Sequence, residues 1–178
     1  MKKTWTLSLY NAVNGSHYTD PSAIQISTIK EVLYLGMHND VSFIIANELS
    51  LYEQQSSYNP NMPVRQFFYA AKLIEQYLEP IKRKFYWKSI VKIPAPKLVF
   101  YNGTDDKDDE IILKLCDAFF DGTKGDIEVT VRMLNINVGR NKALFDACKP
   151  LQEYSWIVDK IRTYSKQMPI ETATCRDV

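Results

Sequence analysis

The sequence predicts an α/β fold with a mixed sheet. Segments with apolar residues at helical spacing alternate with short β-prone runs in the order αβββαβαβα. Two neighbouring runs are joined by a few polar residues, which favours an antiparallel hairpin, whereas the unbroken apolar run 98–101 is typical of a buried parallel strand. With 178 residues the chain is long enough for one domain around a central sheet. We expect this domain to cover 1–168 and a flexible C-terminal tail to cover 169–178.

The predicted elements are a helix over 5–14, strands over 30–37, 40–46 and 49–55, a helix over 64–78, a strand over 98–101, a helix over 108–121, a strand over 127–133 and a helix over 141–166. The first helix ends at Asn14-Gly15, because glycine readily adopts the left-handed conformation that closes a helix. The next three segments are β-prone, and Asn47 favours the turn between the second and the third.

Prolines bound the second helix, because Pro63 precedes its first turn and Pro80 follows its last. The third helix is predicted from apolar residues at helical spacing behind an acidic start, which suits a helix N-terminus. Residues 127–133 alternate apolar and polar, as a half-exposed strand does. The last helix could break at Pro150.

Composition narrows the classes of function. The net charge is only +1, so binding to nucleic acid would need a local basic patch. No apolar run is long enough to span a membrane, and the N-terminus lacks the features of a secretory signal. The three cysteines are widely spaced without a CxxC pair, which is typical of reduced thiols in a cytoplasmic protein rather than of zinc ligands or disulfides.

The hairpin carries the candidate chemistry. Glu53 and Gln55 are two residues apart on one predicted strand, so their side chains share a face. If the turn has two residues, at Ala46-Asn47 or at Asn47-Glu48, Asp40 lies opposite Glu53 or Gln55 on that same face. A three-residue turn would place Asp40 on the other face unless a bulge intervened.

Two carboxylates at that separation repel each other, and a divalent cation removes the repulsion. Asp40 and Glu53 are therefore candidate ligands of Mg²⁺, with Mn²⁺ as the alternative ion. Such a cation acidifies a bound water and neutralises charge that develops on a phosphodiester. Gln55 would orient water or phosphate but cannot act as a base. The alternative is a pair of ordinary acidic residues on a solvated sheet face, and spacing alone does not decide between them.

The same residues carry a resemblance to a known family. The stretches 51–57 and 60–65, followed by Tyr69, resemble the "E-x-Q-S … M-P-x-R … Y" signature of the Rpn family of recombination-promoting nucleases and transposase-like proteins. Segments 39–41, 98–103 and 134–137 are similar to the family as well, so that the resemblance covers about residues 8–168.

The resemblance implies a restriction-endonuclease-like fold of the PD-(D/E)xK superfamily and magnesium-dependent DNA cleavage, linked to DNA recombination or mobile elements. It implies that Asp40 and Glu53 are metal ligands and that Gln55 stands where the superfamily has lysine. It also suggests a homodimer, because nucleases of this fold often cut both strands as dimers. Relatives usually have longer ends, so the alternative is a truncated, inactive remnant that serves as a DNA-binding or protein-interaction module.

Two further features predict contacts to phosphate. Arg65 could reach a scissile phosphate, and the alternative is an arginine paired with a carboxylate at the sheet edge. The segment 82–97 carries cations interleaved with aromatic residues, which favours a phosphate-backbone patch; its alternative is a solvated loop whose aromatics cap the core. These cations are Lys82, Arg83, Lys84, Lys88, Lys92 and Lys97. We expect the acidic run 105–110 to be a solvated loop leading into the third helix, and Tyr69 to pack beneath the sheet with its hydroxyl hydrogen-bonded.

Overall fold

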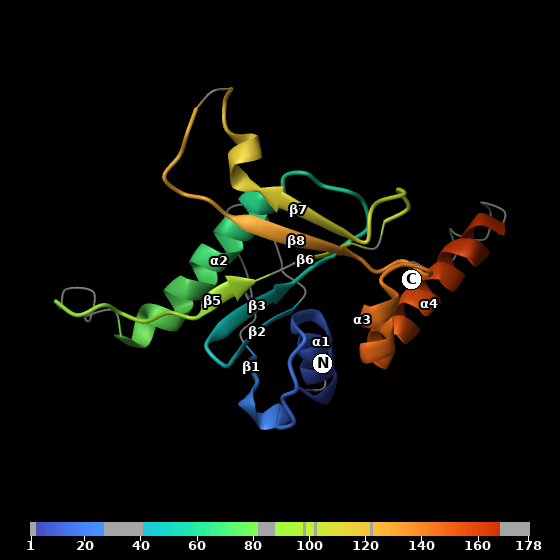
Figure 1. Ribbon diagram of the computed structural model, residues 1–178, viewed down its shortest axis with the longest axis horizontal. Helices are drawn as coiled ribbons and strands as arrows, with labels where there is room; N and C mark the ends of the chain where they lie inside the picture. Colours follow the sequence, from blue (N-terminus) through green and yellow to red (C-terminus); the bar gives the residue numbers. More distant parts are fainter. Residues whose placement is uncertain are drawn as a thin grey trace, which may run out of the picture.

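The computed structural model describes residues 3–26, 41–81, 88–97, 99–101, 103–121 and 123–167. In chain order the elements are α1 (Lys3–Asn14), η1 (Pro21–Ala23), β1 (Gln25–Ile26), β2 (Val41–Ile45), β3 (Glu48–Tyr52), β4 (Gln54–Gln55), α2 (Met62–Leu78), β5 (Ala95–Lys97), β6 (Val99–Tyr101), β7 (Glu110–Lys114), η3 (Leu115–Ala118), β8 (Thr130–Asn135), α3 (Lys142–Ala147) and α4 (Lys149–Gln167) (Figure 1). This is the predicted α/β class with a mixed sheet and an antiparallel hairpin flanked by helices.

The strands form two four-stranded sheets, and the second sheet begins where the first one ends along the chain. The first has the order β1-β2-β3-β5 and the second the order β4-β6-β8-β7. β3 pairs in parallel with β5, and the short strand β4, which follows β3, pairs in parallel with β6, which follows β5. The second ladder therefore continues the first past Glu53, the residue that separates β3 from β4. β4, β6 and β8 are parallel, and β7 runs antiparallel to β8.

The β2–β3 hairpin closes with a two-residue turn at Ala46-Asn47, as one of the predicted registers requires. Ile45 pairs with Glu48, and the two turn residues have φ values of 48° and 67°. Two positive φ values are typical of a type I′ turn, whose twist matches that of the flanking strands. At the open end of the ladder Val41 pairs with Tyr52. Asp40 and the predicted strand 30–37 lie outside the described residues.

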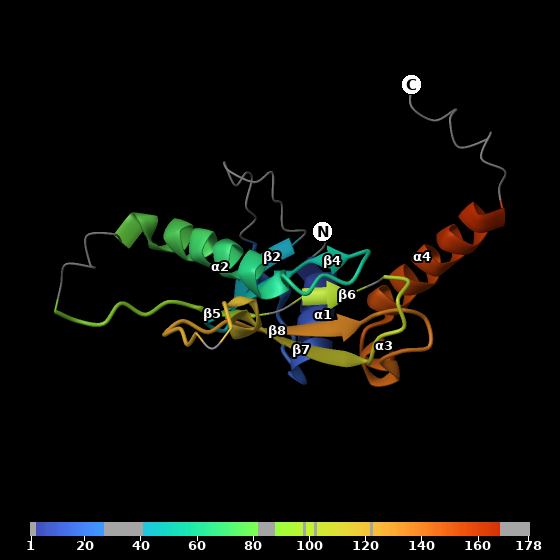
Figure 2. The ribbon, with the colours of Figure 1, turned by 90° about the horizontal axis from the view of Figure 1, so that it is seen from above.

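Helices cover both faces of the hairpin. On one face Leu49 and Leu51 pack with Tyr69 and Leu73 of α2. On the other face Phe43 belongs to a larger buried cluster that also contains residues of α1, β8, α3 and α4. The alternation of side chains along β2 and β3 separates these two cores. Seen from above, α2 and α4 extend toward opposite ends of the molecule (Figure 2).

The predicted helix over 108–121 is wrong, because this segment forms β7 and the short helix η3. Ile111 and Leu113 lie on the face of β7 that packs against the core, whereas Ile112 on the opposite face is 47% exposed. Pairing of all five β7 residues with β8 provides backbone hydrogen bonds that override a local helical pattern.

The other predicted elements of the second half lie close to their predicted positions. The strand over 127–133 is β8, shifted toward its C-terminal end, and the last helix is divided into α3 and α4 at Cys148, two residues before Pro150. None of the described helices combines the length and apolar composition that crossing a bilayer requires.

Candidate active site

Glu53 lies between the end of strand β3 and the start of strand β4. The prediction of one continuous strand through Glu53 and Gln55 is therefore only partly right, since Glu53 itself belongs to neither strand. Its side chain points inward and the residue is only 3% exposed, whereas Gln54 is exposed and Gln55 is half-buried. A charged group therefore lies inside the protein at the open end of the hairpin, on the face that Leu51 also turns toward α2.

Side chains from β4 and α2 surround the Glu53 carboxylate. Its Oε1 accepts hydrogen bonds from Arg65 Nη2 at 2.5 Å and from Gln55 Nε2 at 2.6 Å, and its Oε2 accepts one from Gln66 Nε2 at 3.2 Å. Arg65 also donates from Nη1 to Gln55 Oε1 at 3.3 Å and from Nη2 to the Tyr69 hydroxyl at 3.2 Å. Glu53 and Gln55 thus meet as predicted, although a continuous strand does not hold them.

The position of α2 explains this arrangement. α2 begins at Met62, so Arg65 and Gln66 lie about one turn after the start of the helix, beside Glu53. Tyr69 is four residues after Arg65 and so lies on the same side of the helix. Tyr69 is fully buried and its hydroxyl accepts a hydrogen bond, which confirms the prediction for this residue.

Arg65 is the counter-charge of Glu53. The side chain of Arg65 is 28% exposed and that of Glu53 is 4% exposed, so the ion pair lies at the boundary between core and solvent. Desolvation of a carboxylate is costly, and a hydrogen-bonded guanidinium offsets much of that cost. The alternative interpretation of Arg65, pairing with a sheet-edge carboxylate, describes its contact in this structure.

Gln66 contacts Glu53 although the sequence pattern does not indicate it. It is 5% exposed and donates to Oε2 of Glu53, whereas the hydrogen bonds described above for Arg65 and Gln55 go to Oε1. The position of Gln66 next to Arg65 in the sequence does not predict this contact, because the contact depends on the rotation of α2 relative to the hairpin, which local spacing does not determine.

The donor set has the chemistry that a hard divalent cation prefers. The Glu53 carboxylate and the amide oxygen of Gln55 are oxygen donors that Mg²⁺ or Mn²⁺ could use. In this structure Arg65 contacts both of these groups. Within the described ranges no group of three or more His, Cys, Asp or Glu side chains could hold a metal ion. Asp40, the second predicted ligand, lies outside those ranges.

The predicted phosphate-binding residues are only partly described. Lys82, Arg83 and Lys84 lie outside the described residues. Lys88 and Lys92 are exposed in a segment without helix or strand that leads to β5. Arg65 is the member of the predicted group that the structure places beside Glu53.

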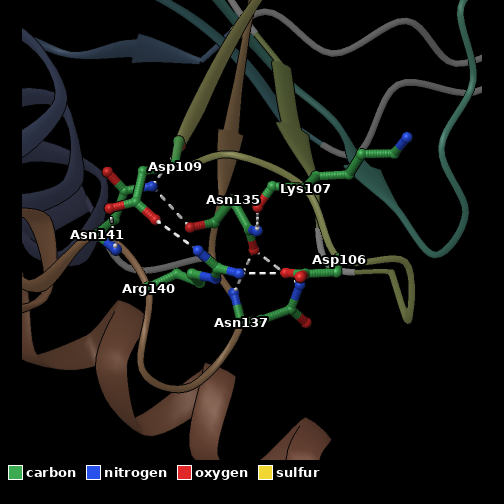
Figure 3. A network of polar contacts seen from close by, with 7 residues as sticks. All are labelled: Asp106, Lys107, Asp109, Asn135, Asn137, Arg140 and Asn141. Atoms are coloured by element: carbon green, nitrogen blue, oxygen red, sulfur yellow. Dashed lines mark hydrogen bonds and ion pairs between the residues drawn. The ribbon is translucent and has the colours of Figure 1, made fainter.

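A polar network lies at the carboxyl ends of the same parallel strands. Gln55, Tyr101 and Asn135 are paired in one row across β4, β6 and β8. The buried Asn135 donates from Nδ2 to the Lys107 carbonyl at 2.7 Å, and its Oδ1 accepts from Asn137 Nδ2 at 2.7 Å (Figure 3). This row places the network two strands away from the candidate site.

Arg140 connects the acidic run 105–110 to this network through ion pairs. It forms ion pairs with Asp106 and, at 3.9 Å, with Asp109 (Figure 3). Asn141, which has a φ of 41°, donates to the backbone carbonyls of Asp109 and Asn135. The acidic run is thus a loop, as predicted, but it leads into a strand and not into a helix, and two of its carboxylates hold an arginine.

Comparison of the chain with models of known protein families, with curated proteins and with solved structures found no match.

Proposed function

We propose that the chain is a magnesium-dependent DNA endonuclease of the PD-(D/E)xK type, related to the Rpn family. The observation that carries the proposal is the buried Glu53 carboxylate, which is held beside Gln55 and Arg65 at the end of the hairpin. The order of a helix, an antiparallel hairpin, a crossover helix and a strand parallel to the hairpin supports a restriction-endonuclease-like core. Asp40, which lies outside the described residues, is the second metal ligand in this proposal because of its position in the sequence.

Each residue of the site has a role in this proposal. Glu53 would hold the cation together with Asp40, and a bound Mg²⁺ would supply an acidified water and a counter-charge for the phosphodiester. Gln55 would orient the water or a phosphate oxygen through its amide. Arg65, which is partly exposed, would exchange its contact with Glu53 for a contact with the scissile phosphate. Lys82, Arg83, Lys84 and Lys88 would bind the DNA backbone.

The test is nicking of supercoiled plasmid by the full chain in Mg²⁺, with and without a chelator. We expect cleavage by the wild type, and its loss by at least a hundredfold, about 3 kcal/mol of transition-state stabilisation, in Asp40→Ala and in Glu53→Gln. Glu75→Gln is the matched control, because Glu75 is an exposed glutamate on α2. Absence of nicking in the wild type, or undiminished nicking in Glu53→Gln, would contradict the proposal.

A second candidate is a DNA-binding or protein-interaction module without turnover. The ion pair between Glu53 and Arg65 favours it, because it neutralises the buried carboxylate without any metal. Both forms of this candidate predict no nicking at any Mg²⁺ concentration, and the DNA-binding form also predicts salt-sensitive binding of DNA by the wild type.

A further inference from the structure

A cavity lies between α2 and the strands that this helix covers. Its volume is about 300 Å³, at the lower end of the usual range for small-molecule sites. An apolar cavity of about 150 Å³ already has room for benzene, so this one has room for a substituted ring. Its wall includes Gln66, Ala70 and Ile74 of α2, Leu51 of β3, Pro96 of β5 and Val131 of β8.

The backbone of β5 explains why the strands leave space beneath α2. Ala95 donates its N–H to the carbonyl of Asn47 at 3.0 Å, on the side of β3. Because N–H groups point to alternate sides along a strand, the nitrogen of Pro96 faces away from β3, and a proline nitrogen has no hydrogen to donate. Within the described residues β5 pairs with β3 alone. On the side of the helix, the short side chains of Ala70 and Ala71 leave the space unfilled.

Gln66 places a hydrogen-bond acceptor in the wall of this cavity. The residue is 5% exposed, and its Nε2 donates to Glu53 Oε2 at 3.2 Å. This contact identifies the nitrogen of the amide, so the other atom, Oε1, is an acceptor. Within the described ranges no residue donates a hydrogen bond to Oε1, and this oxygen is not among the unpaired atoms that the protein encloses completely. A buried amide oxygen without a donor is unfavourable, so Gln66 can gain a hydrogen bond from a molecule in the cavity.

The absence of charge narrows the class of ligand. None of the described residues that line the cavity carries a charged side chain. An ion would lose its hydration there without gaining a counter-charge. The apolar wall instead favours a ring or a short hydrocarbon chain, and the amide oxygen of Gln66 favours one O–H or N–H group at its edge.

We propose that this cavity binds a small, uncharged, mainly apolar molecule whose single O–H or N–H group donates to Gln66 Oε1. This proposal does not rest on the nuclease proposal, because such binding needs neither DNA nor a metal ion.

The experiment is a titration of the full chain with phenol and with toluene, followed by nuclear magnetic resonance of the backbone amides. The two probes have nearly the same shape, but only phenol has a donor. We expect both to bind the wild type and to shift the signals of residues in the cavity wall. In Gln66→Leu, the affinity for phenol relative to that for toluene should fall at least about fivefold, because one hydrogen bond is lost.

A second variant tests the cavity without changing Gln66. Ala70→Phe places a ring in the space that the ligand would occupy, and we expect it to weaken binding of both probes at least about tenfold. Ala143→Phe is the matched control, because Ala143 is an exposed alanine of α3. Circular dichroism of each variant shows whether it is folded.

Three results would overturn the proposal. The first is a wild type that binds neither probe. The second is a folded Ala70→Phe variant that binds both probes as tightly as the Ala143→Phe control does. The third is an unchanged ratio of the two affinities in Gln66→Leu, which would show that Oε1 does not accept a hydrogen bond from the ligand.

Discussion

At the scale of single residues, Glu53 determines what the candidate site can do. A carboxylate that is 3% exposed has lost most of its hydration, and three donors, one of them charged, replace it. Arg65 therefore has a structural role that is separate from any contact with phosphate. Removal of Arg65 should affect stability even in the absence of DNA and metal.

Arg65→Met tests this role, because methionine keeps much of the apolar stem and removes the charge. We expect the free energy of unfolding to fall by about 2–3 kcal/mol, since the buried carboxylate loses its counter-charge. The double variant Glu53→Gln with Arg65→Met should recover part of the loss. Urea unfolding measures both values. Lys72→Met, which removes an exposed partner of Glu75, should cost less than about 1 kcal/mol.

The same variant also relates stability to the proposed metal site. If Glu53 binds Mg²⁺, the cation should stabilise Arg65→Met more than the wild type, because it replaces the missing positive charge. An equal effect of Mg²⁺ on both proteins would contradict metal binding at Glu53 and would leave the structural role of Arg65 intact.

At the scale of helices and strands, the sequence predicts the turns and helix ends whose backbone conformation depends on the residues at that position. Asn47 in the hairpin turn and Gly15 at the helix end, with φ values of 67° and 62°, are residues that accept positive φ, whereas Ala46, with a φ of 48°, has no such preference. The helix predicted for the segment 110–114 is wrong because pairing with β8, from Lys114 with Thr130 to Glu110 with Leu134, decides the conformation of this segment. The contact of Gln66 with Glu53 could not be predicted for the same reason, since it depends on how α2 packs.

The Glu128 carboxylate accepts hydrogen bonds at both ends of the segment that connects β7 with β8, and its ionisation makes the stability of the protein depend on pH. Its Oε1 accepts hydrogen bonds from the backbone N–H groups of Leu115 at 2.8 Å, Cys116 at 3.2 Å and Val129 at 2.8 Å. The hydrogen bond from the Cys116 side chain, followed by these backbone donors, holds the pKa of the Glu128 carboxyl below its ordinary value. The same pairing raises the pKa of the Cys116 thiol.

A lowered pKa in the folded state means that ionised Glu128 stabilises the fold above the ordinary glutamate pKa of about 4.3. This contribution should disappear as the pH falls through the lower, folded-state pKa. Glu128→Gln should therefore unfold at a lower temperature than the wild type at neutral pH, and the two Tm values should converge in acid. Thermal unfolding followed by circular dichroism over this pH range measures the difference. A difference that is constant with pH would contradict the role of the charge.

At the scale of the whole molecule, one core connects the two ends of the described chain. Tyr10 of α1, Phe43 of β2, Leu134 of β8, Phe145 of α3 and Leu151 of α4 belong to the same buried cluster. Periodicity showed which side of each segment is apolar, but it could not show that α1 and α3 share a core, because that contact joins residues more than a hundred positions apart. The helices at both ends should therefore unfold together with the hairpin.

Phe145→Ala tests this coupling, because Phe145 is 6% exposed in the shared core. Loss of its ring should lower the free energy of unfolding by about 3–4 kcal/mol through lost burial and the remaining cavity. Trp5 in α1 and Trp156 in α4 are exposed probes at the two ends, so with Trp87 replaced by phenylalanine, tryptophan fluorescence and circular dichroism should give the same urea midpoint. Phe120→Ala is the control with little expected effect, because Phe120 is 92% exposed. A fluorescence transition that precedes loss of the dichroism signal would show instead that the terminal helices unfold before the sheet.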